Sequence, residues 1–494
     1  MLLSLLLNQV AEVSEGTDCE ITSITLDSRE VVAGTLFVAL KGTQQHGMAY
    51  AKTAEKQGAL AIIWEADDVL NTSDPSNSSL KIPCFKVANL REYLGEVADR
   101  FYGSPSASLK LIGITGTDGK TSVSHFLAQA INNCAVIGTI GIGTLDNLQK
   151  ATHTTPDVLT VHKNLAQLKQ QEIETVAMEV SSHALDQKRV ENVDFDVAVL
   201  TNLSRDHLDY HGTLEAYAEA KEKLFYRKSL KAVVVNLDDK FGRKVADKAT
   251  SDVIAYGVND ADVSSSSSLV DTLMARNVHL SSNGISADIS YKDQSAKIQA
   301  SVLGRFNLSN LLASLGAMLA LGWSLGDAIQ QLNKVETVEG RMEKVSDSDV
   351  LAVVDYAHTP NALKTVLQAL REHTQNKLIC VFGCGGDRDT GKRPLMAEVA
   401  EQYADVVIVT DDNPRTENPQ KIMQDIVAGF KKPELALVEH DRATAILNAL
   451  SQAKMGDAVL IAGKGHENVQ ILATGTVPFS DRDEANKVLQ ELVA

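Results

Sequence analysis

A glycine-rich segment is the first part of the sequence whose residue types and spacing could do chemistry. Residues 113–122 read GITGTDGKTS, between the apolar LKLIGI and the helix-like TSVSHFLAQAI. In such a turn, backbone N–H groups and the helix dipole converge on an anion. Lys120 would neutralise a terminal phosphate, and the Thr121 hydroxyl would reach Mg²⁺. The segment therefore predicts a phosphate-binding loop.

The local sequence bears on whether this segment binds a phosphate at all, and on which nucleotide it would bind. Ile114 stands where the standard G-x-x-x-x-G-K-[ST] loop has glycine, so a chance glycine turn is the alternative interpretation. The sequence contains no N-K-x-D motif that would read a guanine base. We therefore expect ATP.

Acid and imidazole groups follow two strand-like segments. Glu179 ends TVAMEV, and His207 follows TNLSRD after the next predicted strand. Since parallel strands place ligands at their carboxyl ends, both side chains could face the phosphate loop. Carboxylate, hydroxyl and imidazole groups suit Mg²⁺ in phosphoryl transfer, so we expect Thr121, Glu179 and His207 to hold the metal. The alternative for His207, which lies beside acidic residues, is a structural histidine.

The surrounding elements predict an α/β protein of three domains. Residues 1–88 contain short strands and turns of a small α/β module. Residues 89–338 repeat strand, turn and helix around the phosphate loop, which indicates a parallel-sheet ATP-binding domain. Residues 339–494 repeat the pattern and predict a Rossmann-like, doubly wound domain. In both larger domains, polar and glycine-rich segments lie just past strand ends, where such sheets bind ligands.

Composition argues against several classes of function. The formal net charge of −17 disfavours non-specific nucleic-acid binding. The five cysteines form no C-x-x-C pair, which disfavours a zinc site or a disulfide framework and fits a reducing cytoplasm. The start, MLLSLLLNQVAEV, is typical of an amphipathic first helix and lacks a basic region and a cleavage site. No apolar run is long enough to span a membrane, so we expect a cytoplasmic protein.

Ten motifs together resemble the Mur ligase family over essentially the whole chain. They are TGTDGKTS, MEVSSHALDQKRV, TNLSRDHLDYHG, AKEKLF, GRFNLSN, EGRME, DYAHTP, GCGGDRDTGKRP, DDNPR and GKGHE. The resemblance implies a UDP-sugar-binding domain, a central ATPase domain and a C-terminal domain that binds an incoming amino acid. It is closest to the members that extend UDP-N-acetylmuramoyl-L-alanyl-D-glutamate in peptidoglycan synthesis, through an acyl phosphate and with two Mg²⁺ ions. We expect a monomer that acts on small molecules.

The resemblance also assigns residues to the nucleotide and the metal. Lys120, Glu179, His207 and Lys221 would be catalytic. By spacing alone Lys221 is a solvated helix lysine, but the matching lysine of the family is carbamylated and binds the second Mg²⁺. Asn and Asp at element boundaries are also common helix caps, so some of the nucleotide assignments have a structural alternative. The ATP-binding residues would be Gly116, Thr117, Asp118, Gly119, Lys120, Thr121, Ser122, Asn307, Arg341, Asp355 and His358.

Contacts to the UDP-sugar substrate are implied in the first two domains. Arg189 suits a phosphate or a carboxylate. His153 stands where the family often has asparagine, so its contact is open. The residues implied are Leu26, Ser28, Thr43, Gln44, Gln45, His153, Thr154, Thr155, Ser181, Gln187 and Arg189.

Arg415 is the residue from which we predict amino-acid specificity. meso-Diaminopimelate differs from lysine by a second carboxylate, which a guanidinium can hold with two parallel hydrogen bonds. Glu467 would pair with an ammonium group. The alternative for Arg415 is a surface arginine in a turn. The implied diaminopimelate-binding residues are Arg388, Asp412, Asn413, Pro414, Arg415, Gly463 and Glu467.

Three other functions stay open at this point. The chain could add L-lysine instead of diaminopimelate. It could be a folylpolyglutamate synthetase, although the DNPR and GKGHE motifs and the first domain disfavour this. It could also be a nucleotide-binding or scaffold protein without catalysis, against which the intact Lys120, Glu179, His207 and Lys221 argue.

Overall fold

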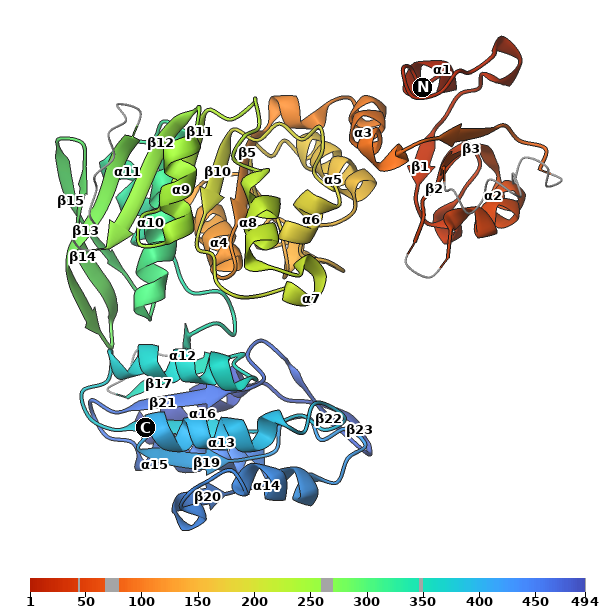
Figure 1. Ribbon diagram of the computed structural model, residues 1–494. Coiled ribbons are helices and arrows are strands. Elements are labelled where there is room, and N and C mark those ends of the chain that lie inside the picture. Colours follow the sequence, from red (N-terminus) through yellow and green to blue (C-terminus); the bar gives the residue numbers. More distant parts are fainter. Residues whose placement is uncertain (43–44, 67–79, 259–269, 346–349, 494) are drawn as a thin grey trace. The chain divides into compact units, whose positions relative to one another are not determined.

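The computed structural model describes residues 1–42, 45–66, 80–258, 270–345 and 350–493 (Figure 1). Contacts divide the chain into two compact units. The first unit comprises residues 1–124, 131–235 and 239–253, and the second comprises residues 125–130, 236–238 and 254–494.

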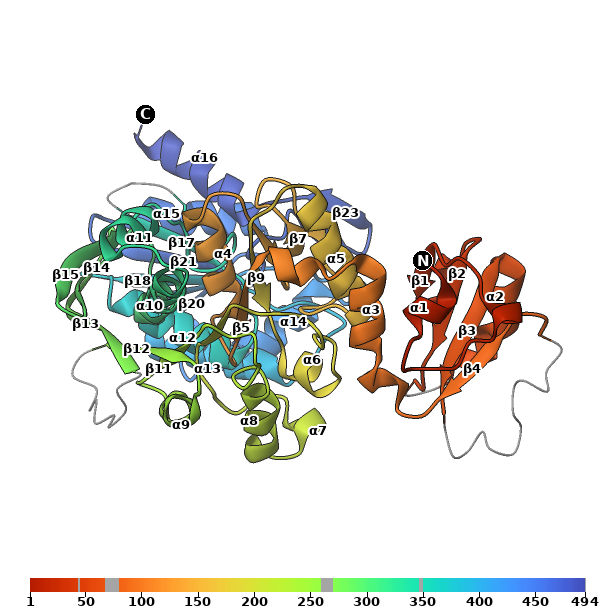
Figure 2. The same cartoon turned by 90° about the horizontal axis from the view of Figure 1, so that it is seen from above.

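The N-terminal module of the first unit is a parallel four-stranded sheet in the order β1-β2-β3-β4 (Figure 2). One face, with Leu36 and Val38, packs on the first and third helices, and the other, with Trp64, packs on the second helix. The strands confirm the four strand predictions for this region. The elements are α1 (Leu3–Leu6), β1 (Ser23–Thr25), β2 (Thr35–Ala39), α2 (Ala51–Gln57), β3 (Ala59–Glu65), β4 (Cys84–Val87) and α3 (Leu94–Tyr102).

The predicted first helix is much shorter than expected. α1 covers four residues, and Gln9 adopts a left-handed φ of 64°, which an α-helix cannot contain. Leu2 instead forms a bridge with Glu20, and the Leu3 N–H donates to Cys19 O at 2.9 Å. The chain start therefore pairs with a later segment, and that pairing competes with a longer helix.

The core of the first unit is a largely parallel sheet in the order β11-β10-β5-β9-β6-β7-β8. β9, β10 and β11 are buried along their whole length, as expected for apolar strands covered on both faces. This confirms the predicted strand–turn–helix order. The strands are β5 (Lys110–Thr115), β6 (Cys134–Ile137), β7 (Gly141–Gly143), β8 (Gln149–Lys150), β9 (Thr175–Glu179), β10 (Val197–Leu200) and β11 (Ala232–Asn236). The helices are α4 (Lys120–Ala130), α5 (Val158–Gln170), α6 (Ser182–Asp186), α7 (Leu208–His211), α8 (Leu214–Glu222) and α9 (Lys240–Lys248).

The second unit begins with an antiparallel meander and two helices. The predicted alternating stretch at 285–303 forms the last two strands of the meander, and the predicted long apolar helix is almost wholly buried. The elements are β12 (Asp252–Val258), whose first two residues belong to the first unit, β13 (Val270–Ser281), β14 (Gly284–Tyr291), β15 (Gln294–Ala300), α10 (Arg305–Ala320) and α11 (Leu325–Leu332).

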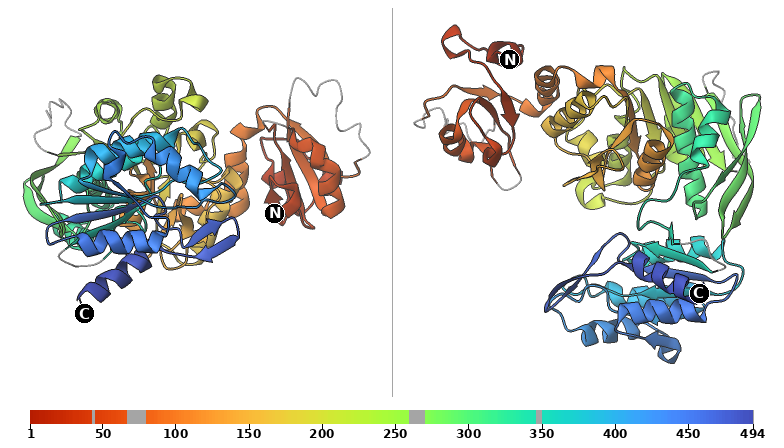
Figure 3. Two further views of the ribbon diagram at one scale, coloured as in Figure 1. Left: turned by 90° about the horizontal axis from the view of Figure 1, so that it is seen from below. Right: turned by 180° about the vertical axis from the view of Figure 1, so that it is seen from behind.

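The remainder of the second unit is a six-stranded sheet in the order β16-β17-β21-β18-β19-β20, between two helical layers (Figure 3). All strands except the first are parallel, which confirms the predicted doubly wound pattern. The strands are β16 (Glu343–Lys344), β17 (Leu351–Asp355), β18 (Leu378–Phe382), β19 (Val406–Val409), β20 (Ala436–Val438) and β21 (Ala458–Ala462), with the hairpin β22 (Val469–Leu472) and β23 (Gly475–Pro478). The helices are α12 (Pro360–Arg371), α13 (Lys392–Tyr403), α14 (Pro419–Val427), α15 (Arg442–Gln452) and α16 (Asp481–Val493).

Within the described residues, none of the helices combines the length and the apolar character needed to cross a membrane.

A buried ion pair ties two helices to the end of β21. Arg442 and Asp481 begin α15 and α16, and both side chains are 0% exposed. The guanidinium donates to the two carboxylate oxygens at 2.6 and 2.7 Å and to Ala462 O at 3.0 Å. Because Ala462 precedes the glycine-rich segment GKGHE, this pair fixes the start of that segment.

Removing one partner of this pair should destabilise the second unit. We expect Arg442→Met to lower the free energy of unfolding by about 3 to 5 kcal/mol, because Asp481 is left buried and unpaired. The matched control is Arg305→Met, since Arg305 forms an exposed pair with Glu372 and its loss should cost less than about 1 kcal/mol. Urea denaturation of the full chain measures both, and equal losses would contradict the assignment.

Candidate active site

The phosphate loop is closed by its own lysine. Gly116 and Gly119 have φ angles of 153° and 84°, and α4 begins at Lys120. The Lys120 ammonium donates to Gly116 O and to Thr117 O, both at 2.8 Å. Removal from water lowers the pKa of Lys120, although nearby carboxylates oppose the shift. The loop thus presents a cation and the N-terminus of a helix at the end of β5.

Glu179 is buried beside the phosphate loop, as its position at the end of β9 predicted. Its side chain accepts hydrogen bonds from Thr121 Oγ1 at 3.2 Å, from Thr139 Oγ1 at 3.1 Å and from Thr139 N at 3.0 Å. A Cβ on Gly138 would meet Glu179 Oε1 at 2.3 Å, so only glycine fits there. Burial raises the pKa of Glu179, while the Thr139 N–H and the Lys120 charge lower it. Thr139 belongs to no motif, so sequence reasoning did not identify it.

Lys221 is buried, so its interpretation as a solvated helix lysine is wrong. Its side chain is 1% exposed, and Nζ donates to Gly116 O at 2.9 Å. The ammonium lies 4.5 Å from the ring centroid of Tyr217. Burial, and then the charge of Lys120, lower the pKa of Lys221 well below its usual 10.5. Two ammonium groups therefore converge on one carbonyl oxygen.

His207 lies at the outer edge of the same cluster. Its side chain is 47% exposed, it has a left-handed φ of 52°, and Nε2 lies 3.5 Å from Asp206 Oδ2. Its ring centroid is 6.0 Å from that of Tyr217, whose hydroxyl is 3.3 Å from Thr117 Oγ1. Tyr217 thus lies between His207 and Lys221 and beside the phosphate loop. Sequence reasoning did not identify Tyr217.

A cavity of about 210 Å³ lies within the first unit. Four residues predicted to contact the UDP-sugar line it together, and Arg91, Asp157 and Lys188 were not predicted. Burial lowers the pKa of the Arg189 guanidinium, and the nearby charge of Arg91 contributes. An anion in the cavity would relieve this repulsion. The lining residues are Leu26, Leu40, Arg91, Leu94, His153, Asp157, Val158, Gln187, Lys188 and Arg189.

Hydrogen bonds connect this cavity to the phosphate-loop cluster. Arg189 donates to Thr155 O at 2.9 Å and to Gln187 Oε1 at 2.6 and 3.0 Å. The Thr155 hydroxyl donates to Glu179 O at 2.9 Å and accepts from Ser181 N at 3.0 Å. The cavity and the buried carboxylate therefore share one polar network.

The other residues predicted for the UDP-sugar are more scattered. Thr154 Oγ1 lies 3.0 Å from Thr139 Oγ1, which places it beside Glu179. Ser28 is buried in a short 3₁₀ helix, and Gln45 accepts from Tyr50 at 3.4 Å. Thr43 and Gln44 lie outside the described residues.

The nucleotide-binding residues predicted for the second unit lie near the start of β16 and the end of β17, apart from Asn307. Asp355 is buried and accepts from Met342 N and Ala357 N, both at 2.7 Å. Burial raises its pKa, and the charges of Arg341 and His358 oppose that shift. Asn307 lies in the first turn of α10 and donates to Leu303 O at 2.7 Å. Much of this polar capacity satisfies backbone groups, as the capping alternative expected.

Aromatic rings connect the nucleotide-side residues to the GKGHE segment. The Arg341 guanidinium lies 5.3 Å from the Tyr356 ring centroid, and the His466 ring lies 5.4 Å on from Tyr356. A Cβ on Gly340 would meet His466 N at 2.2 Å, so the two segments touch through glycine. Neither Tyr356 nor His466 was predicted from the sequence.

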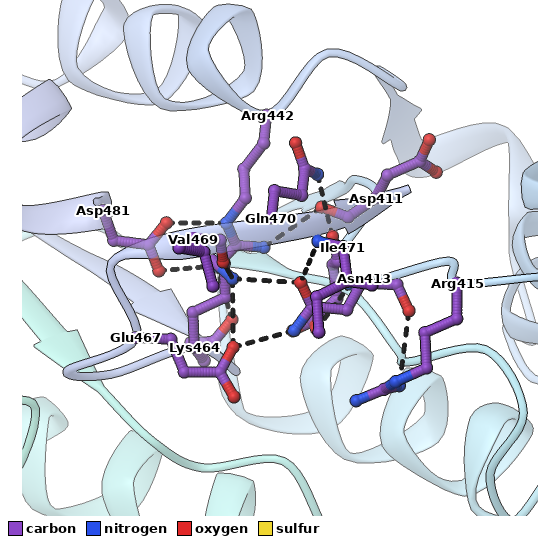
Figure 4. A network of polar contacts seen from close by, with 12 residues as sticks. Asp411, Asn413, Arg415, Arg442, Lys464, Glu467, Val469, Gln470, Ile471 and Asp481 are labelled. Atoms are coloured by element: carbon purple, nitrogen blue, oxygen red, sulfur yellow. Dashed lines mark hydrogen bonds and ion pairs between the residues drawn. The ribbon is translucent and has the colours of Figure 1, made fainter. Parts of the chain in front are cut away.

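Three residues predicted to bind the amino acid, Asn413, Arg415 and Glu467, lie in a second polar network (Figure 4). Arg415 has a left-handed φ of 53°, and its guanidinium donates to Gly386 O at 2.9 Å. Glu467 accepts from Asn413 Nδ2 at 2.8 Å. Arg388 is exposed, and its Cγ and the Arg415 guanidinium both lie near Gly385.

Glycine and proline shape the remainder of this network. Gly463 has a φ of 119°, and a Cβ there would meet Asp412 Oδ2 at 2.6 Å. Pro414 is buried, and its carbonyl lies 2.0 Å from where a Cβ on Gly386 would be. These close approaches hold the loops after β18, β19 and β21 against one another.

Arg393 stabilises the loop that carries Arg415. Its side chain is 0% exposed, and it donates to Glu417 at 2.7 and 2.8 Å and to Asp425 at 2.8 Å. Hydrogen bonds from Arg393 lower the pKa of Glu417 to about 2. Glu417 in turn accepts from Asp387 N at 3.0 Å, which joins the loop to the GGDRD segment. Arg393 was missed, although its place in GKRP was a signal.

Among the described residues, no group of three or more His, Cys, Asp and Glu forms a ready metal site. The Thr121 hydroxyl and the Glu179 carboxylate, however, are hard oxygen donors in direct contact. Such donors suit Mg²⁺ if further oxygens come from other groups. The donor set of this unit therefore fits the predicted metal.

The fold and this cluster define a nucleotide-binding α/β protein, and comparisons identify its family. Family models match at residues 20–102 (Mur ligase family, catalytic domain), 114–318 (Mur ligase middle domain) and 340–465 (Mur ligase, glutamate ligase domain). The chain belongs to the Mur ligase family. The predicted three-domain Mur ligase architecture is confirmed, whereas the boundaries at 88 and 338 stay predictions.

Several similar proteins share the name of a single ligase. The chain is 47% identical over 489 residues to the UDP-N-acetylmuramoyl-L-alanyl-D-glutamate–2,6-diaminopimelate ligases of Ectopseudomonas mendocina and Pseudomonas aeruginosa, covering 98% of each chain. A solved structure of a ligase with this name matches with a TM-score of 0.75 and 37% identity, over 96% of both chains.

The phosphate loop should not tolerate a side chain at position 116. In Gly116→Ala, the new Cβ would lie 1.8 Å from Thr201 Oγ1 and 3.1 Å from Asn202 O. We expect affinity for a non-hydrolysable ATP analogue to fall about tenfold or more, because the loop must move. Isothermal titration calorimetry measures this. Gly326→Ala, where nothing lies within 4 Å, is the control, and unchanged affinity in Gly116→Ala would contradict the role of the loop.

Proposed function

We propose that this chain is an ATP-dependent ligase that adds meso-2,6-diaminopimelate to UDP-N-acetylmuramoyl-L-alanyl-D-glutamate. The products are UDP-N-acetylmuramoyl-tripeptide, ADP and phosphate, within peptidoglycan synthesis. The observation that carries the proposal is 47% identity over 98% of the chain to ligases of that name. The geometry of the polar clusters supplies a part for each chemical step.

The first step activates a carboxylate. A carboxylate is a poor electrophile, so its oxygen first attacks the γ-phosphorus of ATP. The bond from that phosphorus to ADP breaks, ADP leaves, and an acyl phosphate is formed. Lys120 and the start of α4 hold the phosphates, and Arg189 holds an anionic part of the UDP-substrate. Mg²⁺, held by Thr121, Glu179 and His207, would offset the negative charge that ATP and the carboxylate bring together.

Lys221 contributes as a carbamate. Its lowered pKa leaves neutral amine available, and that amine attacks the carbon of CO₂, forms an N–C bond and releases a proton. The product replaces a cation with an anion beside Lys120, which removes the repulsion between the two ammonium groups. Its oxygens would be ligands for a second Mg²⁺.

The second step joins the amino acid. The free amine attacks the acyl phosphate carbonyl, and phosphate leaves. Arg415 pairs with the carboxylate that distinguishes diaminopimelate from lysine, and Glu467 pairs with an ammonium group. Arg388, Asp412, Asn413, Pro414 and Gly463 shape the pocket around them. Lysine would leave the half-buried guanidinium without a carboxylate to pair with.

The cellular setting follows from the substrates. ATP and nucleotide-linked sugars are made in the cytoplasm, and we place the reaction there. We expect the chain to act as a monomer on small molecules, since each predicted contact is assigned within one chain.

Phosphate release with a panel of amino acids tests the proposed function. With ATP, Mg²⁺ and the UDP-dipeptide present, meso-diaminopimelate should give turnover, and L-lysine should give about 30-fold less or lower still. In Arg415→Ala, the KM for diaminopimelate should rise about 30-fold while the KM for ATP stays within about twofold. Arg305→Ala serves as the control. Preference for lysine, or equal effects on both constants, would reject the assignment.

Carbamylation of Lys221 has a direct spectroscopic signature. After equilibration with ¹³C-bicarbonate, the ¹³C NMR spectrum should show a carbamate carbon in the native protein and none in Lys221→Arg. Turnover should also fall in CO₂-depleted buffer and recover when bicarbonate returns. A spectrum without the carbamate signal at full activity would rule this role out.

A further inference from the structure

Lys464 is a buried cation whose contacts all belong to the protein. It lies in GKGHE just after β21, and its side chain is 0% exposed. Its ammonium donates to Asn413 Oδ1 at 3.3 Å, to Glu467 Oε2 at 3.0 Å and to Val469 O at 2.6 Å (Figure 4). An ammonium has three donors, so none is left for a ligand. Lys464 therefore acts on other residues.

Two donors fix one oxygen of Glu467. Its Oε2 accepts from Lys464 and also from Asn413 Nδ2 at 2.8 Å. Among the described residues no hydrogen bond to Glu467 Oε1 is found, and the side chain is 31% exposed. One carboxylate oxygen is thus anchored, and the other is available to a ligand.

The same ammonium sets the orientation of Asn413. Its Oδ1 accepts from Lys464 and from Ile471 N at 2.9 Å, so the amide cannot flip without losing both bonds. Its Nδ2 must therefore face Glu467. Asn413 also lies two residues before Arg415, whose guanidinium is 3.4 Å from Asn413 O. Lys464 consequently supports both ends of the predicted amino-acid pocket.

The charge of Lys464 also keeps Glu467 ionised. Burial raises the pKa of Glu467, but the hydrogen bonds from Lys464 and Asn413 outweigh burial and leave it below its usual value. Glu467 then stays anionic while it waits for a cationic partner. The ionised Glu467 in turn offsets the charge of Lys464, with which it pairs at 3.0 Å.

We propose that Lys464 is a positioning residue for the incoming amino acid: it holds Asn413 and Glu467 so that the free Glu467 oxygen receives the substrate ammonium. This inference rests on the proposed function, because that function supplies the ammonium-bearing substrate. Lys464 touches no substrate itself and is not a catalytic residue.

The test compares Michaelis constants for three substrates in Lys464→Met. We expect the KM for diaminopimelate to rise at least about tenfold, and those for ATP and the UDP-dipeptide to stay within about twofold. Lys464→Arg keeps a cation and should recover part of the loss. Lys487→Met, which changes an exposed lysine of α16, is the matched control and should leave all constants unchanged.

A double-mutant cycle separates positioning from a purely structural role. In a Glu467→Ala background, Lys464→Met and Lys464→Arg should change the KM for diaminopimelate much less than they do in the native chain, because of their two side-chain partners only Asn413 remains. If Lys464→Met does not fold, the cycle with Lys464→Arg decides. Additive effects, or equal loss for all three substrates, would overturn the proposal. If the native chain fails to use diaminopimelate at all, the proposed function fails instead.

Discussion

Two lysine ammonium groups donate to the same backbone oxygen, that of Gly116, at 2.8 and 2.9 Å. Two positive charges so close to each other in a buried site repel strongly, unless nearby anions offset them. The chain as a whole carries a net charge of −17, so it cannot attract anionic substrates through its general field. Local cations must therefore attract these substrates, and they lie near the carboxyl ends of the sheet strands.

Other polar residues of the first unit surround these two lysines and connect them to the cavity. Glu179 supplies the nearby anion. The Thr121 and Thr139 hydroxyls donate to its Oε2, and the Thr139 N–H donates to its Oε1. Through Thr155 the same network reaches Arg189 in the cavity. The second unit uses the same logic with different residues. Lys464, Asn413 and Glu467 form one hydrogen-bonded set, and Arg393 with Glu417 holds the loop of Arg415 beside it.

The sequence predicted the elements better than it predicted their polar partners. Strands rich in valine and isoleucine have a strong pattern. The motifs that follow such strands contain Glu179, Arg189 and Arg415, which the sequence therefore predicted as site residues. The length of α1 could not be read, because pairing of Leu2 with Glu20 competes with local helix propensity. The burial of Lys221 was also hidden, since AEAKEKLF has the pattern of an exposed helix. Thr139, Tyr217 and Lys464 contact Glu179, Thr117 and Asn413, which lie far away in the sequence, and spacing does not encode such contacts.

The central claim is that ATP enters the reaction by phosphorylating the terminal acid of the UDP-substrate. Labelling the free carboxylates of the glutamyl residue with ¹⁸O tests it most directly. After turnover with ATP and diaminopimelate, mass spectrometry of the released phosphate should show one ¹⁸O atom per phosphate, because the carboxylate oxygen leaves with the phosphorus. Unlabelled phosphate together with formation of the tripeptide would contradict the account.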